Sequence, residues 1–166
     1  PRKNHPAVIQ ALRRLPSPIP LVLTGGSLSA AELRFIDSLG MSSYIRQIGF
    51  LSPRDLCAVL QGAVALVYPS LYEGFGLPIL EAMSLSVPVV TSSFGATAEV
   101  AGGAALLVDS RGAGAIDELG AAMARLLEMD GLGEELARLG RLRCSEFPWE
   151  LTAQRHWRLY RQAMVG

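Results

Sequence analysis

The sequence contains few of the residues that build metal centres, disulfide frameworks and nucleic-acid-binding surfaces. It has two cysteines, two histidines and a single lysine, and its 166 residues carry a formal net charge of zero. No cysteine, histidine and acidic residues have the spacing of a metal site, and a neutral chain has no general attraction for nucleic acid. We therefore expect no bound metal ion and no nucleic-acid partner.

The two cysteines, Cys57 and Cys144, lie far apart, each within a helical pattern of apolar residues. We interpret both as reduced residues in or near the core of a cytosolic protein. No stretch approaches the roughly 18 consecutive apolar residues of a membrane-spanning helix. The chain opens with Pro1, without an initiator methionine or a signal peptide, which suggests a fragment of a longer protein.

What the sequence does contain is typical of a folded domain, since half of its residues are hydrophobic and 18% are charged. Short apolar runs alternate with helical patterns. Strands are expected at residues 19–24, 44–50, 64–68, 88–92 and 104–108, and helices at 6–15, 29–39, 52–61, 78–86 and 97–101. This alternation predicts a single α/β domain over residues 1–166 with a doubly wound parallel sheet.

Two helix starts carry local signals. Ser29 with Glu32 three residues later forms a capping box, and Ser52 before Pro53 begins another helix in the same manner. The strand at residues 64–68 is apolar on both faces, which is typical of an interior parallel strand covered by helices on each side.

From Gly114 onward the chain is expected to be helical, with three apolar stripes that we interpret as packing faces. They comprise Ile116, Leu119, Met123 and Leu126; Leu132, Leu136, Leu139 and Leu142; and Trp149, Ala153, Trp157, Tyr160 and Met164. The last helix also carries Arg155, Arg158 and Arg161, which we interpret as a solvated face, with contact to a partner domain as the alternative.

One stretch runs from an apolar strand through a loop with two glycines into a helix. Gly74 and Gly76 lie in the loop, and Pro78 suits the first helical turn, where a missing N–H group costs nothing. Unpaired N–H groups and the helix dipole favour an anion above such a loop. Glu73 and Glu81 flank this position, and acids beside an anion site suit a ligand with hydroxyl groups or a developing positive charge.

In parallel sheets, ligands bind beyond the carboxyl ends of the strands. The loops expected there are residues 25–26, 50–51, 69–76 and 92–96, with Lys3 as a further candidate. Together they suit a ligand with phosphates and hydroxyls, such as a nucleotide sugar. Each feature also has a structural explanation: the glycines serve a tight turn, Glu81 is an exposed acid favoured by the helix dipole, and Arg2 and Lys3 form a solvated terminus.

Residues 73–81, Glu-Gly-Phe-Gly-Leu-Pro-Ile-Leu-Glu, followed by Ala82-Met83 and Val87-Pro88-Val89-Val90, resemble the signature of family 4 retaining glycosyltransferases. The likeness covers nearly the whole chain in order, through residues 2–4, 21–25, 48–50, 68–70, 95–100 and 147–150. Ser86 stands where the family usually has glycine. The resemblance implies the Rossmann-like, C-terminal donor-binding half of a GT-B enzyme with extra C-terminal helices, and the opening residues resemble mannosyltransferase-like members.

The resemblance also implies roles for individual residues. Lys3, with Arg2, would neutralise the donor diphosphate, and Glu73 would lie near the transferred sugar, so that Glu73 and Lys3 are the catalytic candidates. Glu81 would accept hydrogen bonds from the ribose. The remaining donor-binding candidates are Gly25, Phe50, Gly74, Phe75, Gly76 and Leu77. No metal ion or cofactor is expected, because a basic residue and a helix N-terminus do the work of a divalent ion.

The function that the resemblance implies is transfer of a sugar, with retention of configuration, from a nucleotide-diphosphate sugar to a glycan or lipid-linked hydroxyl acceptor. GDP-mannose is the first candidate donor and a UDP-sugar the second. The implied partner is the N-terminal acceptor-binding domain of the same enzyme, in the cytoplasm or at the inner face of the membrane. The alternatives are a noncatalytic nucleotide-binding or interaction domain, and a GT-B-like epimerase or phosphorylase.

The strand that would lead into Pro1 is central in the usual order of such sheets and is absent from this sequence. We therefore expect either a gap in the sheet or a direct pairing between residues 20–24 and 64–68.

Overall fold

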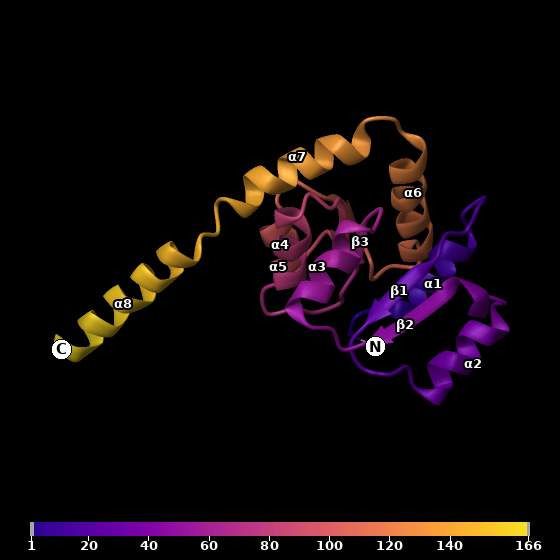
Figure 1. Ribbon diagram of the computed structural model, residues 1–166, viewed down its shortest axis with the longest axis horizontal. Coiled ribbons are helices and arrows are strands. Elements are labelled where there is room, and N and C mark those ends of the chain that lie inside the picture. Colours follow the sequence, from indigo (N-terminus) through magenta and orange to yellow (C-terminus); the bar gives the residue numbers. More distant parts are fainter. Residues whose placement is uncertain (1, 166) are drawn as a thin grey trace.

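The computed structural model describes residues 2–165, in which strands alternate with helices as far as β5 before the chain becomes helical (Figure 1). The elements are α1 (His5–Arg13), β1 (Leu21–Thr24), α2 (Ala30–Ser38), the 3₁₀ helix η1 (Ser42–Tyr44), β2 (Ile45–Gly49), α3 (Pro53–Gln61), β3 (Leu66–Tyr68), α4 (Leu77–Ser84), β4 (Val89–Ser92), α5 (Gly95–Ala101), β5 (Leu106–Val108), α6 (Ala115–Glu128), α7 (Leu132–Cys144) and α8 (Trp149–Val165). Each expected strand and helix is present, with ends shifted by a few residues.

The predicted helix caps are confirmed. Ser29 Oγ accepts a hydrogen bond from Glu32 N at 3.2 Å, and the Glu32 carboxylate accepts one from Ser29 N at 2.8 Å. Ser52 caps α3 by accepting a hydrogen bond from Asp55 N at 3.2 Å. Each cap satisfies a backbone donor that the first helical turn cannot pair internally.

All the strands pair in parallel, as predicted, but they form two sheets. β1 pairs with β2, and β4 lies between β3 and β5. Within residues 2–165 no ladder joins β1 to β3, so a gap rather than a rearranged pairing is present. The interpretation of residues 64–68 as an interior strand is therefore wrong. β3 lies at the open edge of its sheet, because no strand of the described chain occupies its other side.

Helices cover both faces of β4, whose successive side chains point to opposite faces. Val90 packs in a core with α1, α6 and β5, whereas Val89 packs in a second core with α4 and α5. Leu21 of β1 and Val67 of β3 both pack against the first core. The two sheets therefore share one apolar layer beneath α1 despite the gap between them.

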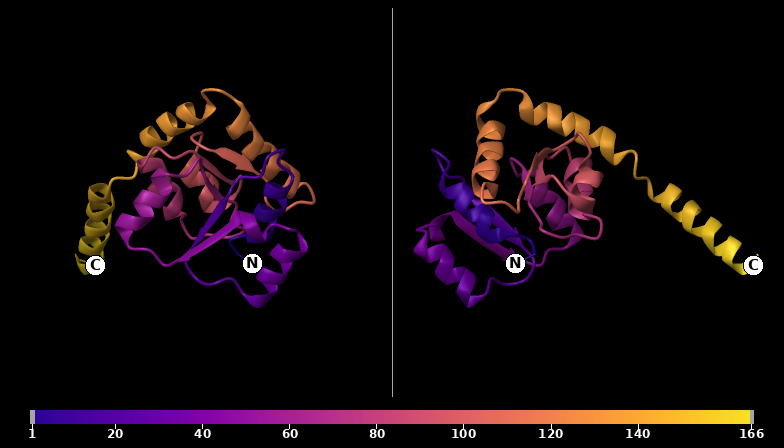
Figure 2. Two further views of the ribbon diagram at one scale, coloured as in Figure 1. Left: turned by 45° about the vertical axis from the view of Figure 1, so that its right-hand side comes forward. Right: turned by 180° about the vertical axis from the view of Figure 1, so that it is seen from behind.

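The C-terminal helices differ in how far they pack. α6 packs against α1 and α7 against α4, which confirms the stripe on α6 and partly confirms the one on α7. α8 extends away from the rest of the molecule in every view (Figures 1 and 2), and the side chain of Trp157 is 63% exposed. The prediction that its stripe packs is wrong, because nothing among residues 2–165 covers that face.

The two cysteines have different environments. Cys57 is exposed on α3, so its prediction as a core residue is wrong, because α3 turns that position toward solvent. Cys144 is half-buried at the end of α7, as expected, and its sulfur lies 3.7 Å from the Leu80 carbonyl oxygen. No helix among the described residues is long and apolar enough to cross a membrane.

Candidate functional site

The loop between β3 and α4 makes a turn that requires glycine. Gly76 precedes α4 with a φ of 101°, in the left-handed region, and a Cβ there would lie 3.3 Å from Ile79 Cδ1. Pro78 falls in the first turn of α4, as predicted. The loop can therefore enter the helix abruptly only with the glycine that the sequence supplies.

The loop also presents unused hydrogen-bond donors. The backbone N–H groups of Gly74, Phe75, Gly76 and Leu77 make no hydrogen bond to any other described residue. A Cβ added at Gly74 would meet nothing within 4 Å, so the space beside it is open. Free donors at the positive end of a helix form a surface suited to an anion.

Lys3, Tyr68 and Glu73 form a compact cluster beside this loop. Lys3 Nζ lies 2.9 Å from Glu73 Oε1, and the Tyr68 hydroxyl donates a hydrogen bond to the same oxygen at 2.7 Å. Lys3 Nζ also donates to the Tyr68 hydroxyl. The Glu73 side chain is only 10% exposed, whereas that of Lys3 is 39% exposed. The cation is therefore the member of the cluster most open to a ligand.

Burial and hydrogen bonds within the cluster change the pKa values of Glu73, Lys3 and Tyr68. Burial raises the pKa of Glu73, but hydrogen bonds from Lys3 and Tyr68, and a smaller effect of Ser70, outweigh it and lower the pKa to about 2. Burial lowers the pKa of Lys3, but hydrogen bonds to Tyr68 and Glu73 reverse the effect and raise it. Burial raises the pKa of Tyr68. At neutral pH the cluster thus combines a carboxylate, an ammonium group and a neutral phenol.

The N-terminal segment that carries Lys3 is tied to two neighbouring loops. The Arg2 carbonyl oxygen accepts a hydrogen bond from Leu71 N at 2.9 Å, just beyond β3. Asn4 adopts a left-handed conformation with a φ of 57°, and its side-chain amide donates to the Ser110 carbonyl oxygen at 3.2 Å. These contacts place Lys3 against Glu73 although 70 positions separate the two in the sequence.

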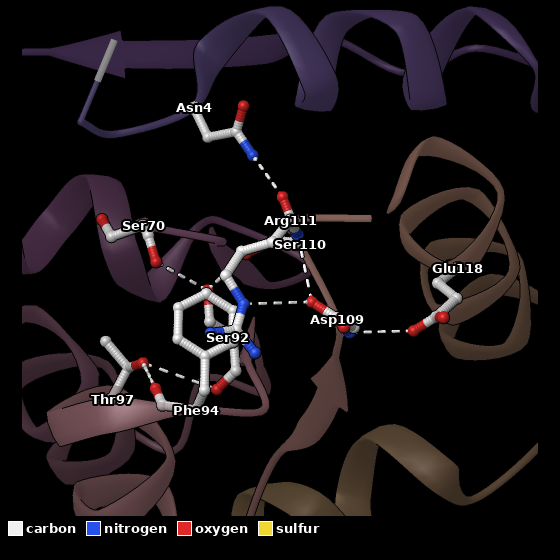
Figure 3. A network of polar contacts seen from close by, with 9 residues as sticks. All are labelled: Asn4, Ser70, Ser92, Phe94, Thr97, Asp109, Ser110, Arg111 and Glu118. Carbon is white, nitrogen blue, oxygen red and sulfur yellow. Dashed lines mark hydrogen bonds and ion pairs between the residues drawn. The ribbon is translucent and has the colours of Figure 1, made fainter. Parts of the chain in front are cut away.

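Buried hydroxyl groups form hydrogen bonds between the segments at the carboxyl ends of the strands (Figure 3). Ser92 Oγ donates to the Ser70 carbonyl oxygen at 2.7 Å and lies 2.8 Å from Ser110 Oγ. Thr91 Oγ1 donates to the Tyr68 carbonyl oxygen at 2.8 Å. The sequence analysis gave these hydroxyl groups no role, although Ser70 and Ser92 lie in the loops predicted at residues 69–76 and 92–96. The available signal was that hydroxyl residues directly follow or end apolar strands, where buried polar groups need partners.

Comparison of the sequence with known protein families identifies the family of this chain. Residues 1–143 match the family described as glycosyl transferases group 1. The chain belongs to this family. The resemblance predicted from residues 73–81 is therefore confirmed.

Named relatives of this group 1 glycosyltransferase chain include two mannosyltransferases. It is 36% identical over 156 residues to the O-antigen chain mannosyltransferase B of Escherichia coli, a match covering 90% of this chain and 40% of the relative. It is 36% identical over 133 residues to the MMP α-(1→4)-mannosyltransferase of Mycolicibacterium hassiacum, covering 80% of this chain and 32% of the relative. The chain thus spans 40% or less of these relatives.

Solved structures confirm the fold of the group 1 glycosyltransferase chain. The sucrose-phosphate synthase of Thermosynechococcus elongatus superposes with a TM-score of 0.86 at 28% identity, covering 99% of this chain and 43% of that protein. HepE of Anabaena, solved with UDP and glucose, gives a TM-score of 0.76 at 24% identity, covering 88% of this chain and 41% of that protein. The predicted α/β fold is confirmed.

The other predicted site residues lie apart from the Lys3–Glu73 pair. The Arg2 side chain is exposed, and Phe50 is 88% exposed beyond the end of β2. Gly25 N donates to the Gly49 carbonyl oxygen at 2.7 Å, which links the ends of β1 and β2. Glu81 is exposed in the second turn of α4. In the described part of the chain, no hydrogen bond or ion pair joins Gly25, Phe50 or Glu81 to the cluster.

The site contains no evident metal-binding cluster. Among residues 2–165, no group of three or more histidine, cysteine, aspartate and glutamate side chains is arranged to hold a metal ion. The positive groups that the site does offer are Lys3 and the free N–H groups of residues 74–77.

Proposed function

We propose that this chain is the donor-binding part of a glycosyltransferase that moves a sugar from a nucleotide-diphosphate sugar to a hydroxyl acceptor. The observation that carries the proposal is that Lys3 pairs with Glu73, the residue directly before the unpaired N–H groups of residues 74–77. A lysine and a helix N-terminus together supply the positive charge and the donors that a diphosphate requires. Family membership supports the same reading.

In this proposal Lys3 and Glu73 act on different parts of the donor. Lys3 neutralises the diphosphate as it leaves, and the Glu73 carboxylate faces the transferred sugar, where positive charge develops. The donors of residues 74–77 replace a divalent ion, so transfer is independent of a metal. Retention of configuration is proposed from the family resemblance. Glu81 accepts hydrogen bonds from the ribose, and Gly25 and Phe50 contact the donor from the ends of β1 and β2.

The sugar that we propose is mannose, carried by GDP. Both mannosyltransferases described above support this choice by name. The HepE structure, whose bound molecules are UDP and glucose, makes a UDP-sugar the second candidate. The acceptor that we propose is a glycan or a lipid-linked hydroxyl compound. We assign its binding to an N-terminal domain of the same enzyme, since this chain covers only 40% of the E. coli relative.

Calorimetric titration of the chain with GDP, UDP and ADP tests the proposal and identifies the base. We expect one of the three diphosphates to bind, and GDP to bind more tightly than GMP because only GDP offers a β-phosphate to Lys3. Lys3→Met should weaken GDP binding about 10-fold to 100-fold, the range expected for a charge-assisted hydrogen bond. Arg155→Met removes a positive charge from exposed α8 and serves as the matched control. Failure of all three diphosphates to bind would overturn the proposal.

Transfer in the intact protein separates the proposal from a noncatalytic nucleotide-binding domain. Glu73→Gln keeps the shape of the side chain and removes its charge, so we expect it to abolish most transfer while GDP still binds. Normal transfer by this variant would favour the noncatalytic alternative. Activity without an acceptor, or dependence on inorganic phosphate, would instead indicate an epimerase or a phosphorylase.

A further inference from the structure

The phenol of Tyr68 has a defined place in the cluster that neither the family motif nor the sequence pattern assigned. Its hydroxyl donates to Glu73 Oε1 at 2.7 Å and accepts a hydrogen bond from Lys3. Lys3 Nζ also lies 4.3 Å from the centre of the phenol ring. A phenol has one proton to donate, and Glu73 receives it. Two donors therefore converge on a single oxygen of the carboxylate.

Tyr68 is held more firmly than Lys3. It is the last residue of β3 and pairs with Thr91 of β4, whose buried hydroxyl donates to the Tyr68 carbonyl oxygen at 2.8 Å. Pro69 and Ser70, the next two residues, are fully buried. Lys3, by contrast, has a long side chain that is 39% exposed. The Tyr68 ring also packs against the second core, so a phosphate that entered the site would displace Lys3 more readily than Tyr68.

We propose that Tyr68 is a positioning residue that keeps the Glu73 carboxylate aimed at the sugar when Lys3 turns to the donor phosphates. This inference rests on the proposed function. In the free protein Lys3 is shared between Tyr68 and Glu73, and an incoming diphosphate competes with Glu73 for it. Once Lys3 has turned, the hydrogen bond from Tyr68 is the one that remains on Glu73 Oε1.

The geometry also gives a role to the second carboxylate oxygen of Glu73, Oε2. Glu73 Oε2 makes no hydrogen bond within the described chain. The buried Ser70 hydroxyl, which has a smaller effect on the pKa of Glu73, has no hydrogen-bond partner of ordinary length and angle, so it does not fix either carboxylate oxygen as Tyr68 does. With Oε1 fixed by Tyr68, Oε2 is the atom that Glu73 offers to the sugar. Loss of the phenol hydroxyl would let the carboxylate rotate, and displacements of about 1 Å can lower rates severely.

Tyr68→Phe tests the inference in the intact enzyme, because it deletes the hydroxyl and keeps the ring. We expect kcat to fall about tenfold, with the KM for the donor and the Kd for GDP within about twofold of wild type. The acid limb of the kcat profile should move to higher pH, because Glu73 loses a donor that stabilises its charged form. Tyr160→Phe, which removes an exposed hydroxyl on α8, should change none of these quantities.

An unchanged kcat and acid limb in Tyr68→Phe, with GDP binding intact, would overturn the inference. Loss of GDP binding by the wild-type protein would instead overturn the proposed function, so the two failures are distinguishable. A second measurement uses carbon NMR to follow the titration of Glu73 with GDP bound, in the wild-type chain and in Tyr68→Phe. If Tyr68 holds Glu73, the pKa of Glu73 is lower in the wild type than in the variant. Equal pKa values in the two proteins would overturn the inference, because Lys3 and Ser70 would then account for the lowering.

Discussion

Replacing Glu73 by glutamine tests how much the charged Glu73 carboxylate, with its partners Lys3 and Tyr68, contributes to the free energy of unfolding. The substitution keeps the shape of the side chain and removes its titration. A pKa lowered from 4.5 to about 2 corresponds to at most about 3.4 kcal/mol. Because the Lys3 side chain is 39% exposed, solvent screening reduces this value. We therefore expect Glu73→Gln to lower the free energy of unfolding by about 1–2 kcal/mol at pH 7.

The pH dependence of this difference has a definite sign. The pKa of Glu73 is lower in the folded state than in the unfolded state, so the unfolded chain binds a proton first as the pH falls. The contribution of the carboxylate is therefore fully present above the unfolded value of 4.5 and is lost as the pH falls toward about 2. The stability difference between wild type and Glu73→Gln should be constant from about pH 7 to pH 5 and shrink below that range.

Urea unfolding followed by circular dichroism, at about pH 7, 5 and 3, measures this difference for both proteins. Glu128→Gln is the matched control, because Glu128 is exposed at the end of α6 and forms no ion pair within the described chain. Its difference from wild type should stay near zero at every pH. A Glu73→Gln difference that is the same at about pH 3 as at pH 7 would refute the reasoning, because it would arise from packing and not from charge.

Three other substitutions test the backbone and the packing around the site. Gly76→Ala should cost about 1–2 kcal/mol, because its φ of 101° is strained for any side chain; no change in urea unfolding would contradict the turn described. Ser86 has a φ of 63°, so Ser86→Gly should relieve about 1 kcal/mol of backbone strain and raise the melting temperature. The substitution also removes the hydrogen bond that Ser86 Oγ accepts from exposed Arg141, and a lower melting temperature would show that this bond contributes more than the strain costs. Gly140→Ala would place a Cβ 3.0 Å from Met83 Cγ, and its overpacking should exceed the gain in helix propensity by about 1 kcal/mol; a more stable variant in urea would show that α7 can shift.

Much of the site could be predicted because its signals are local. The glycine turn before Pro78, the two acids and the apolar strand before them lie within a few residues of one another, and short-range geometry relates them. The caps at Ser29 and Ser52 were predictable for the same reason. Ser86 is different, because the sequence showed only its departure from the family's usual glycine, and the positive φ that explains the glycine comes from the structure.

The partners of Glu73 could not be derived from such signals. Tyr68 was visible as the end of an apolar strand and as part of the family likeness at residues 68–70, but neither gave its hydroxyl a role. That role depends on Lys3, which is 65 positions away in the sequence. The hydrogen bond between Ser92 and Ser70 spans 22 positions and is buried. Contacts of this kind depend on how the elements pack, and no local pattern encodes them.

The sequence by itself determined the order of strands and helices, the turn into α4 and membership of the group 1 glycosyltransferases, because propensities, caps and motifs act over a few residues. Only the tertiary structure decided the gap between β1 and β3, the exposure of α8 and Cys57, and the convergence of Lys3 and Tyr68 on one oxygen of Glu73. Whether an apolar face is buried, and which polar groups meet, depends on surfaces that come together only when distant parts of the chain pack.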